Sequence, residues 1–213
     1  MPTQAERRAT AIARLLDASI ETIAEVGYAK ASAGAITKRA GLSHGALFRH
    51  FETMSDFMAA TAGEALRRQM ADFNGRLAAA EEAGLRIGDV LDILRAVMGS
   101  RTNTVMYELT NAARTDKELQ RILQAGSAAY LAKVRDTAAA LPGLAQFPGE
   151  LFGTLVLMLT DVFDAEASMH AIRPLSADEL ERRDAVLVGI YTWAARLGDA
   201  SPSGSTPNPR ENT

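Results

Sequence analysis

The stretch of sequence that decides the fold is GYAKASAGAITKRAGLSHGALFRHF, residues 27–51. It predicts two short helices: Ser32 is a suitable N-cap for the first, Gly41 ends it, and Ser43 is a suitable N-cap for the second. Two short helices joined by a glycine turn have the outline of a helix-turn-helix. The second helix of such a unit enters the major groove of DNA with its N-terminal residues first, so small and hydrogen-bonding side chains are expected in its first turn.

An amphipathic helix is predicted over residues 5–26, immediately before this stretch. The pattern that follows it is G-Y-x-x-x-S-x-x-x-I-x-x-x-A-G-L-S-x-G-x-L-F-x-H-F. Over residues 7–60 the chain resembles the tetracycline-repressor (TetR) family of transcription regulators, and beyond them it is similar to that family in length and helical pattern. The resemblance implies that the following residues contact DNA: Ser32, Thr37, Ser43, His44, Gly45, Phe48 and His50.

The chain departs from the family pattern at positions that commonly contact DNA. His44, Ala46 and Phe48 stand where members commonly carry Lys, Thr and Tyr, and Met54 stands where the next helix commonly opens with Lys. Phe48 can touch a sugar or a thymine methyl group, but it has no hydroxyl to donate. The basic residues left as candidates for phosphate contacts, each adding to a salt-dependent affinity, are Arg7, Arg8, Lys30, Lys38, Arg39 and Arg49.

Length and charge fit a small DNA-binding head on a larger body. The chain has 213 residues, of which 47% are hydrophobic, so it can form a substantial core. Its formal charge of −3 is unevenly divided. Residues 1–51 hold seven basic and four acidic residues, a net charge of +3, and residues 52–213 hold the remaining −6. A basic head on an acidic body is expected when only the head binds nucleic acid.

The composition also indicates in which cellular compartment the protein is expected. The absence of cysteine excludes disulfides and thiolate metal sites, and the N-terminus has no apolar signal region. The most apolar run, residues 151–160, is shorter than the roughly 20 residues that a membrane span needs. We therefore expect a cytoplasmic protein without a membrane partner.

The hydrophobic pattern predicts an all-α fold in three parts: a helix-turn-helix DNA-binding domain over 1–52, a helical ligand-binding and dimerisation domain over 53–197, and a disordered tail over 198–213. Ser55 is a suitable cap for a long helix that links the first two parts, and Ser176 with Glu179 forms a capping box before the last helix. The helices expected in the second domain cover residues 55–80, 89–100, 101–114, 116–140, 149–172 and 176–197, with a connector over 141–148.

Adaptable and amphipathic side chains in the second domain could line a small-molecule pocket. Methionine changes shape readily, and tyrosine can orient a polar group. The candidates are Met98, Met106, Tyr107, Tyr130, Phe152 and Met158. Polar side chains that could fix a ligand group flank them: Arg101, Asn103, Asn111 and Arg114. The first set could equally fill a helical core, and the second could form a solvated helix face.

The helix expected over 149–172 is apolar nearly all round. Such a helix needs partners on two sides, and in a domain of this size the second partner is best supplied by another subunit. A homodimer is therefore expected, with an interface that contains Leu155, Leu159, Phe163, Ile190 and Trp193.

No arrangement in the sequence indicates catalysis or a bound metal. His44, His50 and the His170 and Glu166 pair lack further ligands at metal-binding spacing, and no catalytic triad order, phosphate-binding loop or H-E-x-x-H motif has a supporting context. The sequence thus predicts no metal, no cofactor and no enzymatic activity.

The interpretation that joins these features is a homodimer that binds a palindromic operator and represses transcription until a small apolar or amphipathic effector enters its C-terminal domain. Two alternatives remain. One is a constitutive or architectural DNA-binding dimer without a ligand switch. The other is a helical ligand carrier or enzyme whose head no longer binds DNA.

Overall fold

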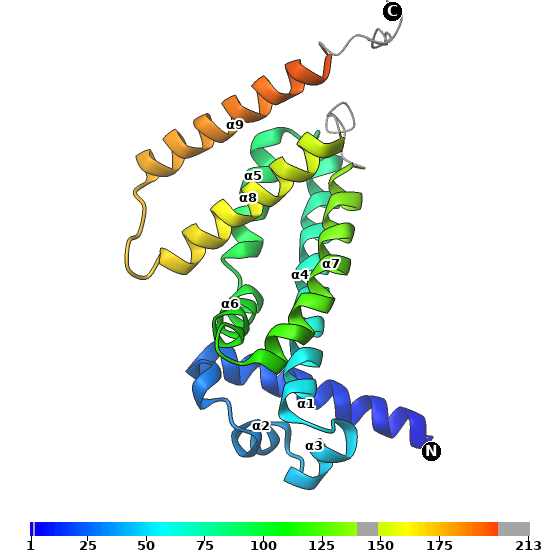
Figure 1. Cartoon of the computed structure of the whole chain (residues 1–213). Coiled ribbons are helices and arrows are strands. Elements are labelled where there is room, and N and C mark those ends of the chain that lie inside the picture. The colour runs from blue at the N-terminus through cyan, green and yellow to red at the C-terminus, as the bar shows by residue number, and fades with distance from the viewer. Residues whose placement is uncertain (2, 140–148, 200–213) are drawn as a thin grey trace, which may run out of the picture.

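The computed structural model of the chain describes residues 1, 3–139 and 149–199 (Figure 1). Within them the chain is all-α, as predicted: it forms nine α-helices, one short 3₁₀ helix (η1) and no strand. None of these helices is both long enough and apolar enough to cross a membrane. The expected connector over 141–148, and the expected tail from residue 200 onward, lie outside the described residues. In chain order the elements are α1 (Gln4–Val26), η1 (Tyr28–Lys30), α2 (Ala33–Ala40), α3 (His44–His50), α4 (Met54–Glu82), α5 (Ile87–Met98), α6 (Arg101–Ala113), α7 (Lys117–Ala139), α8 (Gly149–Met169) and α9 (Ala177–Asp199).

The head consists of α1, η1, α2 and α3, which share one hydrophobic core with the start of α4. Leu15, Ile36 and Leu47 are each 0% exposed and bring α1, α2 and α3 together. Phe57 of α4 is equally buried, and its ring lies 4.9 Å from that of Phe51. The beginning of α4 is therefore packed as part of the head.

The turn between α2 and α3 depends on a glycine and an arginine. Gly41 has φ +63°, a left-handed conformation that ends α2 and that residues with a Cβ rarely adopt. A Cβ there would also lie 2.8 Å from the guanidinium of Arg14. That guanidinium donates a 2.6 Å hydrogen bond to the carbonyl of Ala40, so α1 holds the end of α2 in place.

The long helix α4 begins earlier than the sequence predicted. Thr53, rather than Ser55, is its N-cap, because Thr53 and Asp56 form a reciprocal capping box. The amide of Asp56 donates to Thr53 Oγ1 at 3.0 Å, and the amide of Thr53 donates to Asp56 Oδ2 at 3.1 Å. From this cap α4 runs out of the head and into the body (Figure 1).

The body is built around α4. Helices α5, α6 and α7 pack against it, α8 packs on α5 and α7, and α9 packs on α5 (Figure 1). Leu77 of α4 shares a buried cluster with Val90 and Val97 of α5. On the other side of α5, Leu91 and Met98 form a cluster with Phe163 of α8. The body is thus a set of layers in which α8 and α9 are outermost.

Candidate functional site

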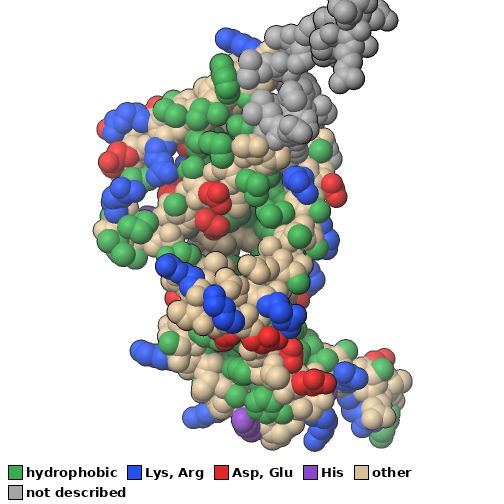
Figure 2. All heavy atoms as spheres, viewed as in Figure 1, with side chains coloured by type: hydrophobic (Ala, Val, Ile, Leu, Met, Phe, Trp, Pro, Cys, Tyr) green, Lys and Arg blue, Asp and Glu red, His purple; other side chains and the backbone are tan. Residues whose placement is uncertain are grey.

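The surface of α3 is formed by its first turns. His44 and Phe48 are exposed, and their rings meet edge to face with centroids 5.0 Å apart. Leu47, which points to a neighbouring face of the helix, is buried and fixes which face is presented. Figure 2 shows a histidine beside hydrophobic side chains at the free end of the head. Gly45 lies in the same turn, and a Cβ added to it would have no atom within 4 Å.

Basic and hydroxyl groups surround this surface. Lys38 and Arg49 are exposed, and neither forms an ion pair within the described part of the chain. The hydroxyl of Ser43 makes no capping hydrogen bond, whereas Ser32 Oγ accepts one from the amide of Ala35 at 3.2 Å. These cations and the free hydroxyl are suited to phosphate oxygens.

Two of the residues expected to face DNA, Thr37 and Arg39, are engaged within the chain. Thr37 is 3% exposed and donates its hydroxyl to the carbonyl of Ala33 at 2.8 Å, so the contact implied for it is corrected to a structural role inside α2. Arg39 is paired with Glu25, which reduces its availability for phosphate. His50 is half-buried at the end of α3.

The body contains a cavity of about 1020 Å³ between α4, α6, α7 and α8. This volume can hold a drug-sized molecule. Figure 2 shows the corresponding face hollowed below α8, with acidic side chains beside the hollow. The apolar side chains in its wall include Leu66, Met70, Met106, Ile122, Leu123, Leu131 and Leu157.

A chain of hydrogen bonds crosses the inner end of this cavity. The hydroxyl of Tyr130 donates to Gln69 Oε1 at 3.1 Å, and Gln69 Nε2 donates to Asn103 Oδ1 at 2.9 Å. Asn103 Nδ2 donates to Asp164 Oδ1 at 2.7 Å and to the carbonyl of Met98 at 2.8 Å. The chain therefore joins α7, α4, α6 and α8, the four helices that form the cavity wall.

Burial shifts the pKa values of Tyr130 and Asp164, the two titratable groups at the ends of this series of hydrogen bonds. Burial, together with the nearby negative charge of Asp164, raises the pKa of Tyr130 to about 12. Burial also raises the pKa of Asp164, as does the charge of Asp161, while the hydrogen bond from Asn103 opposes both. Tyr130 therefore remains a neutral hydroxyl at physiological pH.

The helices that form the cavity also contact the head. On α6, Glu108 Oε2 accepts a 2.8 Å hydrogen bond from the backbone amide of Tyr28. Gly27, with φ +80°, brings the backbone so close that a Cβ there would lie 3.2 Å from the same oxygen. On α4, the hydroxyl of Thr61 donates to the carbonyl of Phe57 and accepts a 3.0 Å hydrogen bond from Ser19 of α1, and both side chains are buried. Two helices of the cavity wall are therefore bonded directly to α1 and η1.

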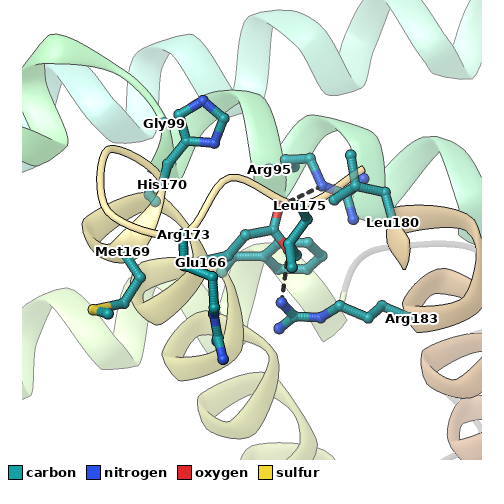
Figure 3. A pocket seen from close by; sticks show the side chains of 11 residues that line it. Arg95, Gly99, Glu166, Met169, His170, Arg173, Leu175, Leu180 and Arg183 are labelled. Carbon is teal, nitrogen blue, oxygen red and sulfur yellow. Dashed lines mark hydrogen bonds and ion pairs between the residues drawn. The ribbon is translucent and has the colours of Figure 1, made fainter. Parts of the chain in front are cut away.

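A second, smaller cavity of about 300 Å³ lies beside an ion-pair cluster that joins α5 to α8 and α9. Arg95 bonds to Glu166 at 2.7 Å and to Asp184 at 2.5 Å, and its guanidinium lies 5.1 Å from the centre of the Phe163 ring. Figure 3 shows Arg95 and Arg183 approaching Glu166 from two sides. The charges are used to hold three helices together, which indicates a structural role for the cluster.

Comparison with known proteins agrees with this geometry. Residues 15–61 match the model of the bacterial regulatory proteins of the tetR family. An HTH-type transcriptional regulator of Mycobacterium tuberculosis, described as uncharacterized, is 50% identical over 190 residues, which cover 89% of this chain and 97% of that protein. The chain belongs to the TetR family. This TetR-family protein is accordingly a DNA-binding transcriptional regulator.

Solved structures show the same fold. A transcriptional regulator from Rhodococcus sp. Rha1 superposes with a TM-score of 0.63 at 23% identity, over 90% of this chain and 99% of its own. The multidrug binding protein EbrR, complexed with malachite green, gives a TM-score of 0.57 at 19% identity, over 84% of this chain and 96% of its own.

The residues expected to bind a ligand in this TetR-family protein fall into three groups. Five of them line the cavity: Met98, Asn103, Met106, Tyr107 and Tyr130. Met158 is 51% exposed on the outside of α8 and does not line it, which corrects that expectation. The side chain of Phe152 lies outside the described residues.

The residues expected at a dimer interface differ in how far the chain itself covers them. Ile190 and Trp193 are exposed on α9, by 37% and 59%. Leu155 and Leu159 are partly covered by packing within the chain. Phe163 is 1% exposed, so the chain itself already covers its ring, and its expected place at the interface is corrected to the core between α5 and α8.

Sequence reasoning missed Gln69 and Asp164, the central and terminal members of the polar chain. Each had a signal. Gln69 follows Phe57, Thr61 and Ala65 at four-residue steps, so a polar side chain falls on the buried stripe of α4. Asp164 directly follows the apolar Phe163 and comes three residues after Asp161, so two carboxylates lie one turn apart in a helix rich in apolar residues. A polar residue in an apolar stripe is more informative than the apolar residues around it.

Proposed function

We propose that this protein is a ligand-responsive repressor, which binds a palindromic operator as a homodimer and leaves it when a small molecule enters the cavity of about 1020 Å³. The observation that carries the proposal is that α4 and α6 form the cavity wall and also contact α1 and η1. A ligand that moves either helix changes the position of the head to which it is bonded.

The mechanism is a shift between two conformations of the dimer. Two recognition helices fit successive major-groove half-sites only when they lie roughly 34 Å apart. A ligand that binds better to a conformation with a different spacing weakens operator binding, by an amount set by its difference in affinity for the two conformations. Helix α4 is suited to transmit the change because its first turns belong to the head core and later ones line the cavity.

The outer face of α9 supports the dimer. Val186, Ile190 and Trp193 follow one another at steps of four and three residues, so they lie on one face of the helix, and all three are exposed in the single chain. Proteins of this family bind operator DNA as dimers. We propose that a second copy of the chain covers this face.

The ligand part of the proposal has support from EbrR, which is described as a multidrug binding protein and was solved with malachite green and with imidazole. It shares the fold with this chain, whose cavity has an apolar wall crossed by a few polar groups. Such a lining suits amphipathic molecules.

The test is operator release. An operator is first selected from a random pool of duplex DNA, and gel-shift titrations then measure its release by a panel of amphipathic compounds that includes malachite green. Met106→Trp narrows the cavity and changes none of the exposed side chains of α3. We expect this variant to bind the operator within about 1 kcal/mol of wild type, yet to need a higher concentration of the active compound for release.

Two outcomes contradict the proposal. If the folded, dimeric Met106→Trp variant releases DNA at the wild-type concentration, the ligand acts elsewhere. If no compound in the panel releases the operator, the constitutive DNA-binding dimer is favoured.

A further inference from the structure

The direction of the hydrogen-bond chain in the cavity is fixed by its ends. The carbonyl of Met98 and the carboxylate of Asp164 can only accept, so Asn103 must turn its amide nitrogen toward both. Its oxygen then faces Gln69, which must present its own nitrogen there. The oxygen of Gln69 is left to accept from the hydroxyl of Tyr130. Every member of the chain donates toward Asp164.

This direction decides what the inner end of the cavity can offer a ligand. The hydroxyl proton of Tyr130 and the amide protons of Asn103 are all used within the chain, and those of Gln69 point to Asn103 and to the sulfur of Met98. The hydroxyls of three further lining residues, Ser127, Thr160 and Ser168, donate to carbonyls of their own helices. What remains beside Asp164 is a set of acceptors, among them its second oxygen, whereas the other lining donors, Asn74, Tyr107 and Thr110, are on exposed residues.

The charged side chains at this end of the cavity are also acidic. Asp161 and Asp164 lie one turn apart on α8. Asp164 forms no ion pair within the described residues, and no cation lowers its pKa. Of the basic residues in the wall, Lys133 is exposed, and Arg67 is 68% exposed and bonded to Glu64 through two nitrogens. A half-buried carboxylate therefore faces the cavity without a positive partner.

Apolar space lies next to this carboxylate. A recess of about 70 Å³ adjoins the cavity, and Gln69, Met98 and Tyr130 line both. The remaining walls of the recess are almost entirely apolar, with side chains such as Phe73 and Leu94. A ligand that fills both spaces must place hydrophobic groups beside a group that can meet acceptors and a negative charge.

We propose that the cavity takes a lipophilic cation, with its positively charged group beside Asp164 and its apolar body against α4, α6 and α7. The inference rests on the proposed function for the location of the ligand site, and it adds the chemical class of the ligand. Neutral compounds and anionic amphiphiles are disfavoured at the inner end, because the first bring no opposite charge to Asp164 and the second bring a like charge to it.

Calorimetric titration of the 213-residue protein compares two probes of similar size: tetraphenylphosphonium, a permanent cation, and triphenylphosphine oxide, a neutral molecule whose polar group only accepts. We expect wild type to bind the cation and to bind the neutral probe at least tenfold more weakly. Asp164→Asn is nearly isosteric and can still accept from Asn103. This variant should weaken cation binding roughly 10- to 100-fold, as expected for loss of a charged partner, and leave the weak binding of the neutral probe unchanged.

The matched control is Asp136→Asn, which removes a negative charge from an exposed position on α7 outside the cavity wall. It should bind both probes like wild type, and thermal unfolding should show all three proteins equally folded. The inference is overturned if wild type binds the two probes equally or binds neither, or if folded Asp164→Asn binds the cation as wild type does. Operator release is measured separately: cations that bind without releasing DNA contradict the proposed function alone, and release by neutral or anionic compounds only contradicts the cation site alone.

Discussion

Gly45 is on the exposed surface of α3, where a side chain would hold the backbone of the helix away from a bound partner. It lies in the first turn, is exposed, and is flanked by His44 on the same surface. A Cβ at this position has no neighbour within 4 Å in the protein, so nothing inside the chain requires glycine there. A requirement for glycine at this position can come only from outside the chain.

We therefore expect Gly45→Ala to stabilise the protein while it weakens operator binding. Alanine is favoured over glycine inside a helix by about 1 kcal/mol, whereas the added methyl group keeps the helix from approaching the DNA closely. Thermal unfolding and gel-shift titration at fixed salt measure the two effects. Gly75→Ala, on α4 and equally free of neighbours, is the control and should change stability only. Unchanged operator affinity in Gly45→Ala would show that α3 does not approach DNA through this turn.

Residues in this region also show what a motif can and cannot predict. Ser32 as an N-cap and Gly41 as the residue that ends α2 followed from backbone chemistry, and both are confirmed. Thr37 was assigned to the DNA surface by resemblance, but its hydroxyl bonds to Ala33 inside α2. Motif position fixes where a residue lies along a helix. Which way its hydroxyl turns depends on the nearest free carbonyl.

Among the elements, α4 is tied to α1 by a network of charges. Arg68 bonds to Asp17 of α1 and to Glu64 of α4, the latter at 2.7 Å. Glu64 also accepts two hydrogen bonds from Arg67. Hydrogen bonds from Arg67 and Arg68, with the attraction of their charges, lower the pKa of Glu64 from 4.5 to about 2. The network is one of the points at which body and head meet.

The lowered pKa of Glu64 predicts a specific pH dependence. A carboxyl group whose pKa falls on folding contributes stability that is complete above about pH 4.5 and is lost as the pH falls toward 2. Glu64→Gln should therefore lower the free energy of unfolding by about 1 kcal/mol at pH 7, with a difference from wild type that shrinks steadily below pH 4.5. Urea unfolding at a series of pH values measures it. Glu118→Gln removes an exposed pair with Arg121 and should have a smaller effect; a pH-independent deficit in Glu64→Gln would contradict the assignment.

The beginnings of helices were predictable to different degrees. Ser176 and Glu179 form the capping box that the sequence indicated before α9. Before α4 two hydroxyl residues compete, and Thr53 is the cap because Asp56, three residues later, can return the hydrogen bond. The periodicity of the hydrophobic residues located the helices. It could not show which helices meet at the cavity, since that depends on packing between residues far apart in sequence.

For the whole molecule, the position of an aromatic ring decides whether it stabilises one chain or two. Trp193 is 59% exposed and Phe163 is 1% exposed, although the sequence assigned both to one interface. Apolar periodicity marks a face as buried, but it does not distinguish burial by the same chain from burial by a partner. Only the packing of α5 onto α8 separates the two cases.

Two variants test this division. Trp193→Glu should convert the dimer to a folded monomer, because a charge that is solvated in the single chain would be buried without a partner between subunits. Phe163→Ala should instead lower the free energy of unfolding by about 3–5 kcal/mol through loss of core packing. Light scattering with thermal unfolding separates the outcomes. A wild-type protein that is monomeric, or a Trp193→Glu protein that remains dimeric, would remove α9 from the proposed interface.

The bond between Glu108 and the head has a consequence for how this protein can diversify. Its donor is the main-chain amide of Tyr28, which nearly every amino acid supplies, so substitutions at that position do not by themselves abolish it. The side chains that we expect to contact DNA lie elsewhere, on α3. In the repressor that we propose, operator preference can therefore change by mutation of α3 while the bond to α6 is kept, and a new DNA target can come under the control of an old ligand.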